Sequence, residues 1–520
     1  MASVLEREAL RSNHRGISSI LDAASVLRVH STKKKGDTSL MVTPVDVNIG
    51  SWFKYPTPPY YRGSNPHNIQ QGTDPWVMDY TGYTHSYVST TGSDSNDGSE
   101  LSPWRTIQHA VNQVTSGGHV INVRGGVYTE NAETVYIYGA PRPAVVMKHS
   151  GSVDNYIAIR SYPGETAIID QGGVGLGFSF VTESYLIFDN LTITNCFTAG
   201  IYSAGNYWSS NIKIVNNHIY NMRGPVGQNV GGVRFDWTTN GYIANNKIHD
   251  VRIPDGTSEG NGNASCLHSY RMATTTVENN TLYDSNRGFF HKQAKQGEGG
   301  VIVRNNHISQ IWEGIRLTVQ GSNEAGVIDS DYYNNIILDA HFGVHAIQGE
   351  CDPLWPATNL RFFNNTFAKH RWLGGEPPFA LYVDGVRDLQ WYNNITHNID
   401  RPIMAIHVVV GEQVVNEIIY CDYNLYYNWV DNRLNIYGTD PDYIYTNMTD
   451  WRANADIDSD MMNLVTSGPD LQSLEVDPLF TNYTSNDFTL QPSSQARNAG
   501  RTGEHIGAYS TDNTFIGVDW

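Results

Sequence analysis

The chain has 520 residues and a formal net charge of -18, from 34 basic and 52 acidic residues. This balance argues against binding nucleic acid or anionic membranes through bulk charge, whereas a local basic cluster inside a groove could still bind an acidic polysaccharide. With 48 glycines, 31 tyrosines and only 17% charged residues, the composition is typical of a β-rich, extracellular-type protein with many turns.

Residues 1–85 are expected to form an N-terminal arm or adaptor. The chain begins without a basic start and apolar run of a secretory signal, and it contains no apolar stretch long enough for a membrane span. A helical pattern at residues 4–27 leads to a basic turn at 33–35 and then to the aromatic and proline-rich segment SWFKYPTPPYYRG. Two interpretations stay open: an arm that packs over the end of the following repeats, or an adaptor that docks on a larger assembly.

The pattern changes at Tyr87. The segment YVSTTGSDSNDGSELSPWRTIQHAV predicts a strand, a polar loop and a short helix. The apolar residues of that helix, which share one face, are Ile107, Ala110, Val111 and Val114. HVINVRGGVYTE then predicts a strand with a glycine turn.

A pair of asparagines recurs down the middle of the chain, in steps of 29, 34, 26, 29, 30 and 29 residues. The pairs begin at Asn216, Asn245, Asn279, Asn305, Asn334, Asn364 and Asn393. A period in this range predicts a solenoid, in which each repeat stacks on its neighbours. Asparagine suits the tight turns because it tolerates the left-handed conformation, and stacked Asn side chains can bond one another.

The repeat ends near residue 425. Residues 426–475 are expected to form an irregular excursion, and residues 476–520 a terminal coil with a C-terminal cap. The DIDSD run at 456–460 could supply oxygen ligands to calcium, but it lacks the glycine and spacing of an EF-hand loop, so a solvated loop is favoured. The four cysteines, which form no CxxC motif and are expected to pack in the core, are Cys196, Cys266, Cys351 and Cys421.

These segments together resemble the pectate-lyase-like superfamily. The opening "YVS-TGSDSNDG----PW-TIQ-A" with "INVRGGVYTE" is similar to its usual first coil, and DPLFTNYTSNDFTLQPSSQARNAGRTGEHIGAY to its last. The resemblance implies an all-β fold, a right-handed parallel β-helix over residues 86–425 with a capping helix at its start. It says little about chemistry, since the superfamily includes lyases, hydrolases, epimerases and inert structural proteins.

The Asn pairs also predict which strand residues face outward, because side chains alternate across a strand. Val233, Leu267 and Leu381 each precede an Asn pair by twelve residues, and Gly288, Gly314 and Gly343 align with Gly232. The inward columns then read Val233/Phe235, Ile315/Leu317/Val319, Val344/Ala346 and Leu381/Val383. The outward residues on the same strands are Arg234, Asp236, His268, Tyr270, Lys292, Arg316, Thr318, His345, Tyr382 and Asp384.

This outward set is basic and aromatic in an acidic protein, and it lies beside the long loops at 253–264, 294–300, 320–329 and 349–359. Outward residues of any solenoid are polar, but their concentration on consecutive coils predicts a binding face. His291 is ambiguous: alternation points it inward, which is costly for an unbonded imidazole, whereas a bulge would bring it out to the substrate.

The segment GFFHKQAKQGEGGVIVRNNHISQIWEGIRLTVQG resembles the Lys-then-Arg pair of β-helix alginate lyases and chondroitinase B. The resemblance implies β-elimination on a uronate polysaccharide, with Lys292 as the base, Arg316 as the charge neutraliser, and His268 or Tyr270 as the acid. The predicted substrate-binding residues are Arg234, Asp236, His291, His345, Tyr382 and Asp384. The calcium-binding Asn and Glu positions of that family have no clear match here, so no cofactor is expected, and bound calcium stays open as an alternative without a motif to support it.

Two alternatives remain at this stage. A glycoside hydrolase needs two carboxyl groups about 5–9.5 Å apart; Asp236 and Asp384 lie five coils apart, so loop acids such as Glu350, Asp352, Asp255 and Glu259 would have to supply the pair. A non-catalytic structural or adhesive component of a virus particle would use the same shape without chemistry. The expected setting is extracellular or virion-associated, as a spike or depolymerase, with a polysaccharide as partner and either a homotrimer or docking through the N-terminal arm.

Overall fold

The computed structural model describes residues 77–509, apart from 206, 226, 254–261, 293–299, 319–326, 348–356, 372–376, 385, 388, 407, 411–412, 416–417, 430–433, 438–442, 446 and 454–468. The chain divides into two units, residues 1–66 and 67–520, and the described residues belong to the second. The arm predicted at residues 1–85 therefore lies mostly outside the described residues, as do Cys351, Val319 and the DIDSD run.

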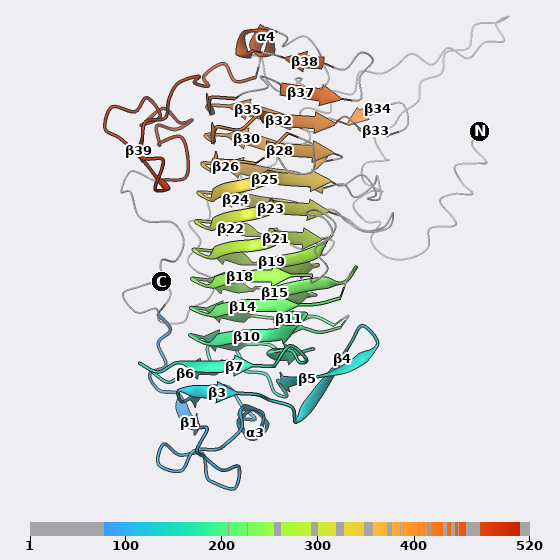
Figure 1. Cartoon of the computed structure of the whole chain (residues 1–520), viewed down its shortest axis with the longest axis vertical. Coiled ribbons are helices and arrows are strands. Elements are labelled where there is room, and N and C mark those ends of the chain that lie inside the picture. Colours follow the sequence, from blue (N-terminus) through green and yellow to red (C-terminus); the bar gives the residue numbers. More distant parts are fainter. Residues whose placement is uncertain are drawn as a thin grey trace, which may run out of the picture. The chain divides into compact units, whose positions relative to one another are not determined.

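The described chain is a right-handed parallel β-helix, as the sequence predicted, and its strands stack one coil above another (Figure 1). One long parallel sheet, here the first sheet, takes one strand from each coil. Its strands are β1 (Thr84–Val88), β2 (His119–Val123), β6 (Ile157–Ser161), β9 (Leu186–Asp189), β13 (Ile212–Val215), β17 (Tyr242–Ala244), β20 (Thr276–Glu278), β22 (Ile302–Arg304), β24 (Ile328–Tyr333), β26 (Ala357–Phe363), β30 (Leu389–Tyr392) and β35 (Ile418–Asp422), with β29 (Val386–Arg387) beside β26.

The second sheet contains the other long strands of each coil, and most of its pairings are parallel. Its strands are β3 (Gly126–Tyr128), β4 (Glu133–Ile137), β5 (Ala140–Val146), β7 (Ala167–Asp170), β8 (Phe178–Phe180), β10 (Thr192–Phe197), β11 (Ala199–Ser203), β14 (His218–Arg223), β15 (Asn229–Asp236), β18 (Lys247–Arg252), β19 (Asn263–Tyr270), β21 (Thr281–Lys292), β23 (His307–Thr318), β25 (Ile336–Ile347), β27 (Thr366–Ala368), β28 (Phe379–Asp384), β31 (Ile395–His397), β32 (Arg401–Ile406), β36 (Leu425–Tyr427), β37 (Leu434–Tyr437) and β38 (Tyr443–Tyr445).

Short pairs and two helices complete the described elements. The pairs are β12 (Ser209–Ser210) with β16 (Thr238–Thr239), β33 (Val408–Val410) with β34 (Gln413–Val415), and β39 (Phe480–Asn482) with β40 (Asp487–Leu490). Helix α3 (Ile107–Gln113) is the predicted capping helix, and its apolar face is buried. The Thr106 side chain caps its N-terminus by accepting the His109 backbone N–H. Helix α4 (Met448–Ala453) lies near the other end of the chain.

The asparagine pairs form the turns between the two sheets, and they do so as predicted. The first Asn of each pair has a positive φ, from 52° at Asn279 to 58° at Asn216. The second is buried and bonded to the next coil: Asn306 donates its side-chain and backbone N–H groups to Oδ1 of Asn335, at 3.0 and 3.1 Å. The ladder runs through Asn217, Asn246, Asn280, Asn306, Asn335, Asn365, Asn394 and Asn424.

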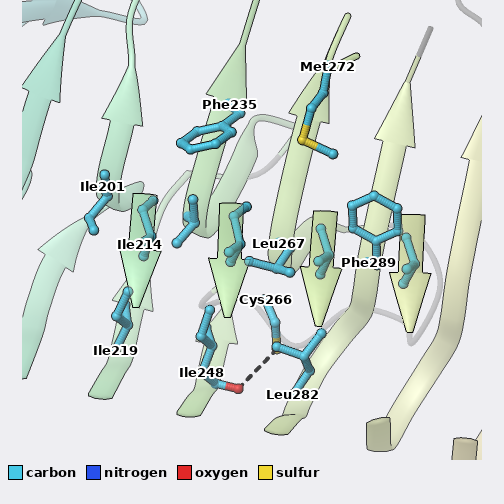
Figure 2. Packing of buried hydrophobic residues seen from close by; sticks show 14 of the residues in the cluster. Ile201, Ile214, Ile219, Phe235, Ile248, Cys266, Leu267, Met272, Leu282 and Phe289 are labelled. Atoms are coloured by element: carbon cyan, nitrogen blue, oxygen red, sulfur yellow. Dashed lines mark hydrogen bonds between the residues drawn. The ribbon is translucent and has the colours of Figure 1, made fainter. Parts of the chain in front are cut away.

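A column of glycines marks where strands of the second sheet bend around the core. The register aligns Gly232, Gly288, Gly314 and Gly343, as predicted. A Cβ on Gly288 would lie only 2.5 Å from Cγ2 of Ile308. Cys266 occupies the same column, and its thiol donates to the Ile248 carbonyl at 3.3 Å (Figure 2). Cys196, Cys266 and Cys421 are buried, as expected.

The C-terminal part differs from the expectation in two ways. Strands β36 and β37 pair in parallel with β31 and β32, so the stacking continues into the segment expected to be irregular. Tyr423 takes the place of the first Asn there, which concealed this coil from the sequence pattern. Residues 476–509 form no further parallel coil among the described strands. Instead, the antiparallel β39–β40 pair packs on the side of the stack, against Ile395 and Leu425.

No helix within the described ranges is long and apolar enough to cross a membrane.

Candidate active site

The predicted outward residues lie on one face of the second sheet, which we call the polar face. The register of β15, β19, β21, β23, β25 and β28 aligns them in two neighbouring columns. The first column contains Arg234, His268, Phe290, Arg316, His345 and Tyr382. The second contains Asp236, Tyr270, Lys292, Thr318, Ile347 and Asp384.

His291 does not belong to the polar face, and its predicted role in substrate binding is wrong. It pairs with Ser269 and Leu317 in the inward column, and its side chain is fully buried. The ladder from Phe290 to Lys292 continues without a bulge, so strict alternation holds. The imidazole therefore faces the core beside Phe289, with ring centroids 5.8 Å apart.

Lys292 and Tyr270 form the centre of the polar face. They are direct neighbours in the second column, on adjacent coils. The Lys292 ammonium donates to the Tyr270 hydroxyl at 3.0 Å and also lies 4.7 Å from the ring centroid of Phe290. Burial is the main cause that raises the pKa of Tyr270, so the phenol keeps its proton at neutral pH.

The amine of Lys292 is poised to lose its proton near neutrality. Its side chain is buried, and burial lowers its pKa to about 7, helped by the positive charges of Arg287, Arg234 and Arg316 and opposed by Asp236. Desolvation disfavours the ammonium, and nearby cations disfavour it further. A lysine so tuned is suited to act as a general base.

Glu313 is a buried carboxylate that holds the arginines in place, and the sequence argument missed it. It forms ion pairs with Arg287 and Arg316 and contacts His345 Nδ1. Burial opposes its charge, but the two arginines and His345 hold the pKa of Glu313 well below its usual range. Arg287 also donates to the Gly262 carbonyl at 2.6 Å, so its position is fixed from two sides.

Arg287 and Glu313 were missed because the strand bends between them and the predicted columns. Counting back by twos from Lys292 places Arg287 on the inward side. The bend at Gly288 and Gly314 directs two successive positions toward the core, so that the residue before each glycine faces outward. The glycine column was visible in the sequence and could have revealed this change of phase.

Arg316 keeps a hydrogen-bond donor unused among the described residues. Its Nη1 donates to Glu313 at 3.0 Å and lies 2.5 Å from Nδ1 of His345, whereas its buried Nε has no hydrogen-bond partner in that part of the chain. A buried donor without an acceptor is costly, so the guanidinium is set to receive an anionic group. Burial lowers the pKa of His345 to about 4, which keeps its imidazole neutral.

Arg234 and Asp236 lie where they were predicted, but they bind each other. Arg234 donates two hydrogen bonds to the Asp236 carboxylate, at 3.2 and 2.7 Å, and a third to the Tyr138 hydroxyl at 2.6 Å. Both side chains are buried. The pair therefore contributes rigidity beside Lys292 but little net charge, and a sugar could reach it only by competing with these bonds.

His268 is buried between Arg234 and Phe290 in the first column. Neither ring nitrogen has a hydrogen-bond partner within the described part of the chain. Burial, then the charges of Arg234 and Lys292, holds the pKa of His268 well below its usual range, so the ring is neutral. Of the two candidate acids, Tyr270 is therefore better placed to donate a proton.

The far end of the polar face is more open. Tyr382 and Asp384 are partly exposed, and burial raises the pKa of Asp384. Most of the predicted flanking loops, including Glu350, Asp352, Asp255 and Glu259, lie outside the described residues. Over the described ranges, no group of three or more His, Cys, Asp or Glu side chains could hold a metal ion.

Comparison with known families now places this architecture. Residues 86–306 match the model of the Pel9A-like right-handed β-helix region. Over these residues, which are less than half of the chain, the sequence is similar to that family. The crystal structure of pectate lyase Pel9A superimposes with a TM-score of 0.50 at 15% identity, over 83% of this chain and 97% of that chain. This likeness concerns the fold.

Two curated relatives match shorter stretches of sequence. The uncharacterized protein YwoF of Bacillus subtilis is 31% identical over 147 residues, which are 26% of this chain and 28% of that protein. Pectate lyase PEL9 of Emericella nidulans is 37% identical over 84 residues, which are 16% and 18% of the two chains. The matches thus span less than a third of either relative.

Proposed function

We propose that the protein cleaves an acidic, uronate-containing polysaccharide by β-elimination on the polar face. The observation that carries this proposal is the buried Lys292, with a pKa of about 7, hydrogen-bonded to the hydroxyl of Tyr270 at 3.0 Å. The similarity of parts of the chain to proteins named pectate lyases supports the same class of reaction.

In the proposed reaction, the neutral amine of Lys292 accepts the proton on C5, beside the uronate carboxylate. The released electron pair forms a C4–C5 double bond, and the bond from C4 to the glycosidic oxygen breaks. The Tyr270 hydroxyl gives its proton to the departing oxygen. Arg316 binds the carboxylate through its unused Nε–H, which makes the C5 proton more acidic and stabilises the charge that develops.

The Lys292–Tyr270 hydrogen bond also returns the site to its starting state. After cleavage, Lys292 is an ammonium and Tyr270 a phenolate, separated by one hydrogen bond. The pKa of Lys292 is about 7 and that of Tyr270 is raised above its ordinary value, so the proton passes from nitrogen to oxygen downhill. Neither group needs solvent to recover its proton state.

Hydrolysis by two carboxylates is less well supported. On the described polar face, Asp236 is bonded to Arg234 and Glu313 to Arg287 and Arg316. Asp384 shares a column with Asp236 but lies five coils away, about 24 Å at 4.8 Å per coil. An extracellular or virion-borne setting, with docking through residues 1–85, would suit the proposed activity and stays a prediction.

The test is a screen of uronate and neutral polysaccharides, following unsaturated products in the ultraviolet. We expect an acidic substrate to yield them, and Lys292→Ala and Arg316→Ala each to lower the rate by about 100-fold or more. Arg252→Ala, which changes an exposed arginine on the neighbouring surface, is the matched control and should keep the rate. If reducing ends appear without unsaturated products, the proposal is wrong.

A further inference from the structure

The β4–β5 hairpin covers the sheet next to the polar face. Strand β5 pairs with β8, and β4 pairs with β5 in antiparallel fashion, so the hairpin leaves the stack near its N-terminal end (Figure 1). Its Ile137 and Ala144 pack in one buried cluster with Ala199, Tyr202 and Ala204 of the coil that contains β11. The hairpin therefore covers the outer side of that coil.

The covered coil directly precedes the polar coils. Ala199 and Tyr202 align with Gly231 and Arg234 on β15. Ala204 follows Ser203, the partner of Phe235, and so takes the position of Asp236. The same columns thus change from apolar residues under the hairpin to charged residues beyond it, and the change coincides with the hairpin edge.

The tip of the hairpin is anchored to the polar face by a strained residue. Tyr138 and Gly139 form the turn, with φ of 50° and 78°. A two-residue turn of this kind favours Asn-Gly, and a tyrosine at positive φ costs about 1 kcal/mol or more. In return, the Tyr138 hydroxyl donates to the Asn229 carbonyl at 2.5 Å and accepts from Arg234 at 2.6 Å. Strain that the surroundings hold in place at such a point indicates a functional role.

We infer that the β4–β5 hairpin is an end wall of the substrate-binding face and sets the length of the products. This inference rests on the proposed β-elimination. Lys292 lies on β21, and β19 is its neighbour on the preceding coil. One coil further is β15, where Arg234 donates to the Tyr138 hydroxyl. Two coil spacings of about 4.8 Å leave room for about two sugar residues, since a pyranose in an extended chain advances by a similar distance.

The wall makes a direct prediction for the unaltered protein. Given uniform uronate hexamers, it should release one fragment of two units or fewer in nearly every cleavage. Tyr138→Asn removes the anchor and the ring while placing a favoured residue in the turn, so the hairpin should still fold. We expect this variant to raise the fraction of cleavages with three or more units on both sides by roughly fivefold or more, because the hydroxyl loses both of its hydrogen bonds.

Tyr136→Ala is the matched control, because Tyr136 belongs to the same hairpin but is 77% exposed. Its product lengths should equal those of the unaltered protein. Abundant products with three or more units on both sides from the unaltered protein, or an unchanged pattern in Tyr138→Asn, would overturn the end wall and leave β-elimination standing. Absence of any unsaturated product from acidic polymers and oligomers alike would overturn the proposed function, and the end wall with it.

Discussion

At the residue scale, the site depends on one buried amine among several guanidinium groups. Lys292 is surrounded by Arg234, Arg287 and Arg316, whose charges would repel one another without Asp236 and Glu313. The two carboxylates pair with these arginines and offset part of their charge, and Asp236 also opposes the lowering of the Lys292 pKa. The gathering of three arginines around one lysine explains how an acidic protein can present a basic site.

The pH dependence of cleavage should report the protonation of Lys292. Its pKa is lowered to about 7, so the amine is neutral above that pH and charged below it. We expect log(kcat/KM) to rise with unit slope as the pH increases toward about 7 and to level off above it. A rate that instead falls across this range would contradict the assignment of Lys292 as the base.

Arg287→Gln should shift the rising part of the pH profile to higher pH. Removing a neighbouring cation removes repulsion that disfavours the ammonium, so the pKa of Lys292 rises toward its ordinary value. Arg252→Gln is the control, since Arg252 pairs with Asp250 and Asp284 on the neighbouring surface. Its profile should match that of the unaltered protein. An unchanged profile in Arg287→Gln would show that the charge of Arg287 does not contribute to the lowered pKa of Lys292.

At the scale of the element, the asparagine ladder ties each coil to the next. Each buried side-chain amide bonds to its neighbours on both sides. The Asn335 amide oxygen accepts from the backbone and side chain of Asn306, and its NH2 group donates to the side chain of Asn365 and to the Val303 carbonyl. The ladder fixes the turn that precedes each long strand of the second sheet. Because those strands carry the polar face, the ladder also sets the register of the site.

Asn335→Ala should lower the free energy of unfolding by about 2–3 kcal/mol, because two buried backbone groups of the preceding coil, the Asn306 N–H and the Val303 carbonyl, lose their partners. Denaturant unfolding measures this. Asn334→Gly is the matched control, since Asn334 has a φ of 53° that glycine adopts readily, and its cost should be small. Equal effects of the two changes would mean that the ladder contributes little beyond the turn conformation.

At the scale of the molecule, the sequence predicted the fold well because a solenoid is built from local repeats. The Asn pairs, the capping helix at Ile107 and the glycine column each involve a short stretch of chain and its next coil. Features that depend on distant contacts escaped prediction. The Tyr138–Arg234 bond joins residues 96 positions apart, and the β39–β40 pair packs against coils far earlier in the chain.

The site was predicted in part, because the alternation of side chains along a strand is also a local pattern. Alternation placed Lys292 and Tyr270 side by side, and their contact is present. It failed for Glu313 and Arg287, where a bend changes the phase of the strand. For His291, alternation was right, and the bulge proposed to bring it out is absent from the described ladder.

The central claim is that the glycosidic bond breaks by elimination and not by attack of water. The most direct measurement is cleavage of an acidic polysaccharide in water enriched in heavy oxygen, with mass analysis of the products. We predict products that carry no heavy oxygen in the newly formed ends beyond ordinary exchange, with a total mass equal to that of the substrate. Fragments that together gain one labelled water for each bond cleaved would contradict the account.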